Sequence, residues 1–584
     1  MRQPDVGHES RCVGPAGRWL VGVDRRLSGL VQAATSRQTS TATSSPGRRY
    51  AIARRPGRRQ IPLPTTPPPG TSGRGCAIGQ LCSEQDKTTS GPRNGWDGVG
   101  VGDDYYPLYG NGGYDVAHYL LKISYNPATD RLVGVATISA RATETLCRFN
   151  LDFQGMTVRS VVVDGKRAMW SPSQDHELTV TPRHQLTRGR RFTTVVRYDG
   201  VPRTQIDLSV PDEPLPYGWI HTDDGAVVVS EPEGSANWFP LNDHPTDKAA
   251  FTFVVTVPAG LQAISNGRLV GRRTHGQRTT WVWDAPDPMA PYLATATIGR
   301  FDLRRYRTAR GLRMYDAVDP DLYDQPVDPQ DPAAATFGEL ADGSLARRGE
   351  ILGFLAGRFG PYPFSTGGGI VDDAPDLFFA LENQTRPIYP GSFFTDPVDG
   401  DLLVVHELAH QWFGDSVALA EWKHIWLNEG IATYAEWLWS EDHDLGTAQE
   451  AFDFFYNDLP AGDPFWDVVV GDPGIPFLFD GAVYVRGAMT LQALRNQVGD
   501  RDFFRILRAW AQRKAGGDGT TGQFIALAER VSGEQLDQLF ETWLFTATKP
   551  ALPAATATGK LRAPPAASSL LQRLPTAALG LRRS

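Results

Sequence analysis

The sequence predicts an α+β protein of several domains, in which a β-rich half precedes a mainly α-helical half. With 584 residues the chain is long enough for two or more domains that each bury a full hydrophobic core. Short runs of alternating apolar and polar residues recur from residue 103 to 304, whereas apolar residues with a period of 3.6 dominate from 305 to 548. The order of these two patterns gives the expected order of the two domains.

The β-rich half, residues 103–304, is expected to form a sandwich or a saddle-shaped sheet. Turn signals such as Asn126-Pro127 and Asp164-Gly165 separate its alternating runs. The expected strands include residues 118–125, 132–139, 159–163, 192–198 and 251–257.

The second half, residues 305–548, has longer segments with helical periodicity. The expected helices are residues 333–359, 402–413, 428–440, 447–457, 482–498, 502–514 and 522–531. One strand-like segment, residues 370–383, precedes the second of these helices.

Both ends of the chain differ in composition from its body. Residues 1–102 are rich in Arg, Pro, Gly, Ser and Thr, residues 549–584 are rich in Ala and Pro, and both are expected to be disordered. The first hundred residues carry a net charge of +9 and the tail one of +6, which leaves −23 for the body. An acidic body argues against nucleic-acid binding, which requires a basic face. No apolar run reaches the roughly 20 residues that span a bilayer.

The four cysteines do not suggest a disulfide framework. Only Cys147 lies in sequence that has the pattern of a folded domain, inside an alternating run. It is interpreted as a half-buried structural thiol.

A metal-binding motif lies in the middle of the helical half. The segment 404–410 contains the pattern H-E-x-x-H in an apolar helical context. Positions i and i+4 lie about one turn apart on the same helix face, so His406 and His410 can bind one ion. Glu407 can then take a proton from water at the open position of the metal. The alternative is a pair of core histidines beside a surface glutamate.

A catalytic zinc needs a third protein ligand, and Glu429 is the candidate. It follows His410 by 19 positions, and Gly414-Asp415 between them can end the first helix. Glu429 would open a second helix that faces the first. Glu436 shares the inner face of that helix and is expected to hydrogen-bond a ligand histidine, unless it is a surface acid. Two histidines and one glutamate with an open fourth position suit amide hydrolysis by activated water.

These residues resemble the zinc aminopeptidases typified by aminopeptidase N, a gluzincin family that also includes leukotriene hydrolase. The family signature is H-E-x-x-H followed, after eighteen residues, by the glutamate of W-L-N-E-G, and it matches residues 406–430. The resemblance covers about residues 103–548, with segments 110–116 and 238–248 typical of compact bacterial members. It implies a thermolysin-like catalytic domain over 305–548 and one zinc ion per chain. Full-length relatives add a large helical C-terminal domain, and this sequence departs from them in that no such domain is expected after residue 548.

The resemblance also implies substrate-binding residues. The G-A-M-E-N motif of the family, whose glutamate binds the free α-amine, corresponds to residues 379–383. Glu382 is therefore expected to bind the ammonium group of the substrate, with Ala380 and Asn383 beside it on an extended segment that can pair with the substrate backbone. Phe379 replaces the first glycine and leaves the shape of the first side-chain pocket open.

Two further roles follow from the resemblance. An acid of the β-rich domain helps to anchor the amine, and it corresponds to Glu231, with Glu233 as the rival. A tyrosine hydroxyl that stabilises the tetrahedral oxyanion corresponds to Tyr484, for which the alternative is a packing role. A preorganised donor at that position can lower the barrier by about 2.7–4 kcal/mol.

The residues and the resemblance together predict a zinc-dependent aminopeptidase that acts on peptides with a free N-terminus. The alternatives are a zinc endopeptidase, an epoxide hydrolase on the same scaffold, and a non-catalytic binding module. Peptides are the only expected partners, without nucleic acid or a membrane span, and the sequence carries no signal for an oligomeric state. Compact relatives are often exported, but residues 18–34 lack the apolar centre of a signal peptide, so an extracellular and a cytoplasmic location stay open.

Overall fold

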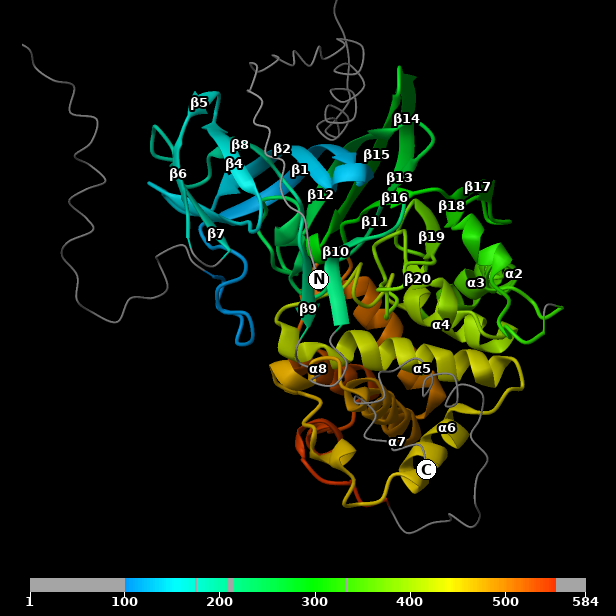
Figure 1. The fold of residues 1–584 in the computed structure, drawn as a ribbon. Helices are drawn as coiled ribbons and strands as arrows, with labels where there is room; N and C mark the ends of the chain where they lie inside the picture. Colours follow the sequence, from blue (N-terminus) through cyan, green and yellow to red (C-terminus); the bar gives the residue numbers. More distant parts are fainter. Residues whose placement is uncertain (1–99, 174–175, 208–214, 332, 553–584) are drawn as a thin grey trace, which may run out of the picture. The chain divides into compact units, whose positions relative to one another are not determined.

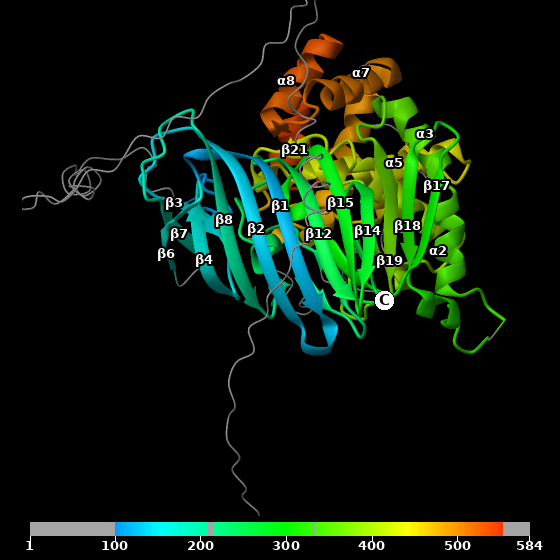
Figure 2. The ribbon, with the colours of Figure 1, turned by 90° about the horizontal axis from the view of Figure 1, so that it is seen from above.

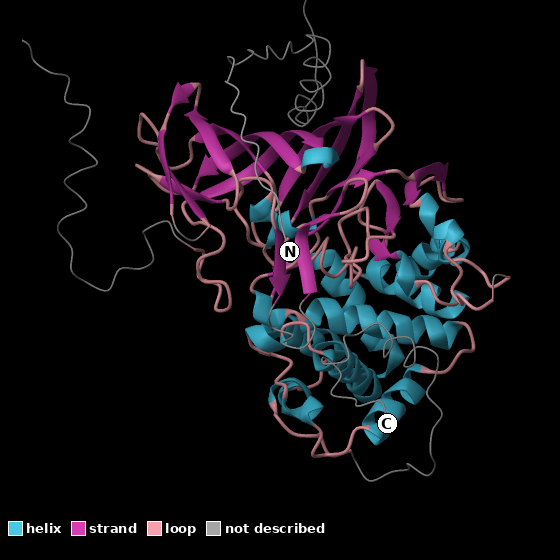
Figure 3. Cartoon of the chain, in the orientation of Figure 1, coloured by secondary structure: helices cyan, strands magenta, loops and turns pink. Residues whose placement is uncertain are grey.

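A computed structural model describes residues 100–173, 176–207, 215–331 and 333–552. The two segments expected to be disordered, 1–102 and 549–584, lie almost entirely outside these residues. The described residues belong to the same compact unit of the chain. In it, the strands of the first half gather on one side and the helices of the second half on the other (Figures 1 and 3). The expected α+β order is thereby confirmed.

The largest sheet of the first half has the strand order β14-β15-β12-β1-β2-β8-β4-β5, and its central strands lie side by side in Figure 2. Its central strand β1 buries Tyr119, Leu121, Ile123 and Tyr125, at every second position, against the core. All five expected strands lie within this sheet. Its members are β1 (Tyr114–Asn126), β2 (Arg131–Ala142), β4 (Thr157–Val163), β5 (Lys166–Arg167), β8 (Arg191–Gly200), β12 (Ala249–Pro258), β14 (Arg268–His275) and β15 (Arg278–Met289).

Two smaller sheets complete the first half. A five-stranded sheet has the order β13-β16-β11-β10-β9, and its last two strands form a hairpin that extends toward the helices (Figure 1). These five strands are β9 (Thr204–Asp207), β10 (Leu215–His221), β11 (Ala226–Val229), β13 (Gln262–Ser265) and β16 (Ala296–Gly299). A three-stranded sheet contains β3 (Phe149–Asp152), β6 (Met169–Pro172) and β7 (Glu177–Thr181).

The second half combines a four-stranded sheet with helices. The sheet contains β17 (Asp302–Arg307), β18 (Arg313–Val318), β19 (Thr366–Asp372) and β20 (Ile388–Pro390). The expected domain boundary between residues 304 and 305 falls inside β17. The helices are α2 (Phe337–Ala346), α3 (Arg348–Phe359), α4 (Pro397–Ala409), α5 (Trp426–Asp442), α6 (Ala448–Asp458), α7 (Gly481–Arg513), α8 (Thr521–Ser532) and α9 (Asp537–Phe540). None of them is both long and apolar enough to cross a bilayer.

The structure corrects two local expectations in the second half. The helix expected over residues 333–359 is two helices, α2 and α3, which meet at Arg347. By contrast, the two helices expected over 482–498 and 502–514 are both present, because α7 consists of two helical segments separated at Gly499, whose φ of 75° and ψ of 160° are not helical. The strand expected over 370–383 ends at Asp372, where the Asp372 carboxylate accepts a hydrogen bond from Ala374 N–H at 2.9 Å and turns the chain. Pro375, which has no N–H to donate, follows directly.

The interpretation of Cys147 as a structural thiol is wrong. The residue is half-buried, as expected, but it lies in a bend before β3 and is disulfide-bonded.

Candidate metal centre and substrate cleft

The two histidines lie at the C-terminal end of α4, which is buried along its length from Asp399 onward. Asp396 caps the start of the helix, and its carboxylate accepts hydrogen bonds from the N–H groups of Val398 and Asp399 at 2.7 and 3.1 Å. His406 and His410 follow three turns later, one turn apart, with ring centroids 4.9 Å from each other. The helix therefore presents both imidazoles to the same side.

Glu429 approaches the histidines from the first turn of α5, which packs against α4. Its Oε2 lies 3.3 Å from His406 Nε2 and 3.5 Å from His410 Nε2. Ligand atoms at bonds of about 2.0–2.1 Å in a tetrahedral zinc site are separated by about 3.3–3.4 Å. These two separations and the chemistry of the three donors therefore fit a zinc ion.

The remaining ring nitrogens of the histidines are hydrogen-bonded in a way that leaves Nε2 free to bind a metal. His406 Nδ1 lies 2.7 Å from Oε1 of the buried Glu436, and His410 Nδ1 lies 3.0 Å from the carbonyl oxygen of Phe413. Since both oxygens accept, each Nδ1 carries the proton and each Nε2 presents its lone pair. Glu436 thus lies where a residue that orients a ligand histidine is expected.

The ionisable side chains of this site are buried, and burial and their mutual interactions shift their pKa values. Burial would raise the pKa of Glu429, but the two histidines lower it to about 2. Burial would lower the pKa of His410, but Glu429 and Glu382 hold it well above its usual value. Burial raises the pKa of Glu407 to about 7, while the histidines act in the opposite direction. The shifts of these groups therefore follow from burial together with the opposite charges that lie beside them.

Helices α5 and α7 cross closely beside the three candidate metal ligands. A Cβ atom at Gly430 would lie 2.8 Å from the Cα of Gly487, and the reverse distance is also 2.8 Å, so only glycines allow this approach. The crossing brings Tyr484 of α7 beside His406, with the two rings stacked at 6.1 Å. Burial and the neighbouring carboxylates raise the pKa of Tyr484 well above its usual value, so the hydroxyl stays a hydrogen-bond donor.

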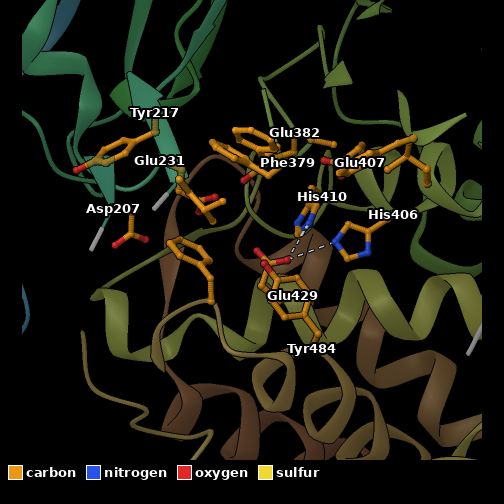
Figure 4. Close-up of a pocket in the computed structure, with 16 residues that line it drawn as sticks. Asp207, Tyr217, Glu231, Phe379, Glu382, His406, Glu407, His410, Glu429 and Tyr484 are labelled. Carbon is orange, nitrogen blue, oxygen red and sulfur yellow. Dashed lines mark hydrogen bonds and ion pairs between the residues drawn. The ribbon is translucent and has the colours of Figure 1, made fainter. Parts of the chain in front are cut away.

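A cleft runs from the metal ligands to the hairpin of β9 and β10, and it is walled mostly by apolar side chains. Figure 4 shows Glu231, Phe379 and Glu382 along one side of it and Glu429 and Tyr484 along the other. Further aromatic and polar lining residues are Asp207, Tyr217, Phe378, Phe393 and Phe479.

Two buried carboxylates lie in the cleft beyond the metal ligands. Glu382 Oε1 accepts a hydrogen bond from the hydroxyl of Tyr292 at 2.8 Å. Glu231 Oε1 is buried and has no hydrogen-bond partner among the described residues. Because burying carboxylates without a compensating charge is costly, a cationic group between these two acids would be stabilised.

The other residues expected to contact substrate lie in different surroundings. Ala380 lines the cleft. Asn383 does not, because its side-chain amide donates to the carbonyl oxygen of Leu293 at 2.9 Å. Glu233, the rival of Glu231, accepts a hydrogen bond from Tyr217 at 2.8 Å and does not line the cleft.

Two residues of the site were missed in the sequence. Tyr292 contacts Glu382 although the two residues are 90 positions apart in the chain, and no local sequence pattern predicts such a contact. Gln411 follows His410 directly and bridges α4 to the segment that carries Glu382, with its amide hydrogen-bonded at both ends. Its place next to the second histidine was the only available signal.

Family models match both halves of the chain. The model described as the peptidase M1 N-terminal domain matches residues 115–293, and the model described as the peptidase family M1 domain matches residues 398–543.

Similar proteins include Aminopeptidase M1 of Arabidopsis thaliana, which is 28% identical over 58% of this chain and 38% of its own length. Probable aminopeptidase 2 of Sulfurisphaera tokodaii is 23% identical over 68% of this chain and 49% of its own length. The chain therefore spans less than half of the length of these two curated relatives.

Solved structures of an M1 zinc metallopeptidase from Deinococcus radiodurans match over nearly their full length. One has a TM-score of 0.68 at 28% identity and covers 79% of this chain and 100% of its own. Another is a glutamate-to-alanine mutant bound to a Tyr-Ser-Ala substrate, with a TM-score of 0.67 at 28% identity, covering 78% and 98% of the two chains.

Proposed function

Because the chain belongs to peptidase family M1, we propose that it is a zinc-dependent aminopeptidase that removes single residues from peptides with a free N-terminus. The proposal takes His406, His410 and Glu429 as the zinc ligands and Glu407 as the general base. The distances of Glu429 Oε2 from the two histidine nitrogens, which fit tetrahedral spacing, support the choice of metal.

The observation that carries the proposal is the short distance between the amine site and the reacting groups. Carboxylate oxygens of Glu382 and Glu407 and a ring nitrogen of His410 lie within 4.8 Å of one another. In one amino acid the amine nitrogen and the carbonyl carbon are about 2.5 Å apart, whereas a second residue would lengthen this to about 6 Å. An ammonium group at Glu382 therefore leaves room for one residue before the cleaved bond.

Glu382 and Glu231 bind the ammonium group, whose charge compensates two buried carboxylates. A zinc ion at the three ligands supplies Lewis-acid chemistry that polarises a carbonyl group and lowers the pKa of water. Glu407 accepts a proton from the attacking water and returns it to the leaving amine. The hydroxyl of Tyr484 donates a hydrogen bond to the oxyanion that forms.

The proposal is tested by loading the full chain with zinc and comparing leucine p-nitroanilide with its N-acetyl derivative. We expect rapid hydrolysis of the free-amine substrate and none of the N-acetyl derivative. We expect Glu407→Gln to lose this activity while it retains its zinc content. Cleavage of N-acetylated peptides at internal bonds at a comparable rate would instead identify an endopeptidase. An absence of hydrolysis in zinc-loaded protein against a panel of aminoacyl anilides would overturn the proposal.

A further inference from the structure

We propose that Gln411 is a positioning residue that fixes the distance between the Glu382 carboxylate and the metal helix, and thereby sets the cleavage register. The inference rests on the proposed aminopeptidase function. Gln411 touches neither the cleft nor the metal ligand atoms, and it acts through the segment that carries Glu382.

The side-chain amide of Gln411 joins the two parts of the site directly. Its Nε2 donates to the carbonyl oxygen of Glu382 at 2.9 Å, and its Oε1 accepts from the backbone N–H of Thr385 at 2.8 Å. The hydroxyl of Tyr362 lies 3.3 Å from the same Oε1. Gln411 is fully buried, so water does not compete for these hydrogen bonds. One amide thus holds both ends of the segment 382–385.

This segment needs such a constraint because its backbone is strained. Thr385 has a φ of 65°, in the left-handed region that β-branched residues avoid. The tight turn is closed by a hydrogen bond from Arg386 N–H to the carbonyl oxygen of Asn383 at 2.7 Å. The hydroxyl of Thr385 accepts from Gly267 N–H at 2.8 Å, so the β-rich half holds the turn from its other side. Strained backbone persists where its surroundings fix it. Here Asn266, which donates to the carbonyl oxygen of Gln384 at 2.9 Å, and the buried guanidinium of Arg386 also hold the turn, while Gln411 is the contact that links it to the metal helix.

Gln411 controls the distance between the Glu382 carboxylate and the groups on the metal helix. Gln411 follows the ligand His410 in the chain, so its amide ties the amine-binding carboxylate to the metal helix through a few bonds. Without it, the turn relaxes and Glu382 loses its fixed separation from Glu407 and His410. Because a misplacement of 1 Å can cost about 100-fold in rate, small relaxation changes which substrates react.

The test compares two substrates that differ in the spacing between amine and carbonyl. Leucine p-nitroanilide has one carbon between these groups, and β-homoleucine p-nitroanilide has two. We expect Gln411→Leu in the full, zinc-loaded chain to lower the ratio of their kcat/KM values at least tenfold. Gln411→Glu keeps the acceptor for Thr385 N–H but replaces the donor to Glu382. Its ratio of kcat/KM values for the two anilides is expected to fall at least threefold. This variant tests the inference if Gln411→Leu does not fold.

Gln492 of α7 provides a matched control. It is also buried, and its amide also has three partners: Tyr434 at 2.7 Å, Gln449 at 2.9 Å and Asn496 at 3.0 Å. Gln492→Leu is expected to leave the substrate ratio unchanged within twofold, even where both rates fall. An unchanged ratio in both Gln411 variants, or an equal fall in Gln492→Leu, would overturn the inference.

Failure of the proposed function would be distinct from failure of this inference. If the wild type hydrolyses neither anilide, the aminopeptidase proposal fails, and the register is then judged by calorimetric binding of leucinamide and β-homoleucinamide. A preference for leucinamide that is lost in Gln411→Leu supports the inference. Equal binding of the two amides by the wild type, or no binding of either, overturns it.

Discussion

Replacement of Glu436 by alanine is expected to weaken zinc binding by about 10- to 100-fold, which is the typical effect of removing a hydrogen-bond partner of a ligand histidine. Glu436 is fully buried, and its Oε1 lies 2.7 Å from His406 Nδ1. Its loss leaves that N–H without its carboxylate and frees the imidazole to rotate. The expected loss of affinity corresponds to about 1.4–2.7 kcal/mol. Glu436→Gln keeps the volume and an acceptor oxygen, so its effect should lie near tenfold.

Zinc affinity is measured by competition with a chromophoric chelator. Glu441→Gln serves as the control, because Glu441 lies on the same helix but pairs at 2.9 Å with Arg495, away from the site. The control should retain wild-type affinity. The reasoning is refuted if Glu436→Ala binds zinc as tightly as the wild type, or if the control loses as much affinity.

Three further predictions concern other parts of the site and the fold. Tyr484→Phe should lower kcat by about 10²–10³ with little change in KM, measured by steady-state hydrolysis, and an unchanged kcat would remove the oxyanion role. Tyr292→Phe should raise KM for free-amine substrates by about tenfold or more, because a buried hydrogen bond to the Glu382 carboxylate is lost, and an unaltered KM would contradict this. Burial raises the pKa of Asp247 to about 7, above its unfolded value, so its contribution to stability is present below about pH 4 and is lost as the pH rises to about 7. The melting temperature of Asp247→Asn relative to that of the wild type should therefore rise between pH 5 and pH 7.5. A difference in melting temperature that stays constant over this range would disprove the pKa shift of Asp247.

The ligand set could be predicted because it depends on local geometry. The interval of four residues between His406 and His410 places both on one helix face in any α-helix, and Gly414 gives the chain a place to turn before Glu429. Contacts of this kind are encoded within a few turns of the chain. Strands such as β1 and β2 were also predictable, because the alternation of apolar and polar residues along a strand is a local pattern.

The surroundings of Glu382 could not be predicted in the same way. The segment after Asp372 is apolar enough to be taken as a strand, but the turn that Asp372 forms with Ala374 ends the pairing and leaves Glu382 in a loop. The partner Tyr292 comes from the other half of the chain, so only the assembled fold brings it to Glu382. The left-handed Thr385 also has no sequence signal, because glycine or asparagine is the usual residue in that conformation.

The most direct measurement is an anomalous diffraction map at the zinc absorption edge from crystals of the zinc-loaded chain. One peak is expected, about 2.0–2.2 Å from His406 Nε2, His410 Nε2 and a carboxylate oxygen of Glu429. A peak at another site, or the Glu429 side chain turned away from the ion, would contradict the assignment on which the proposed chemistry rests.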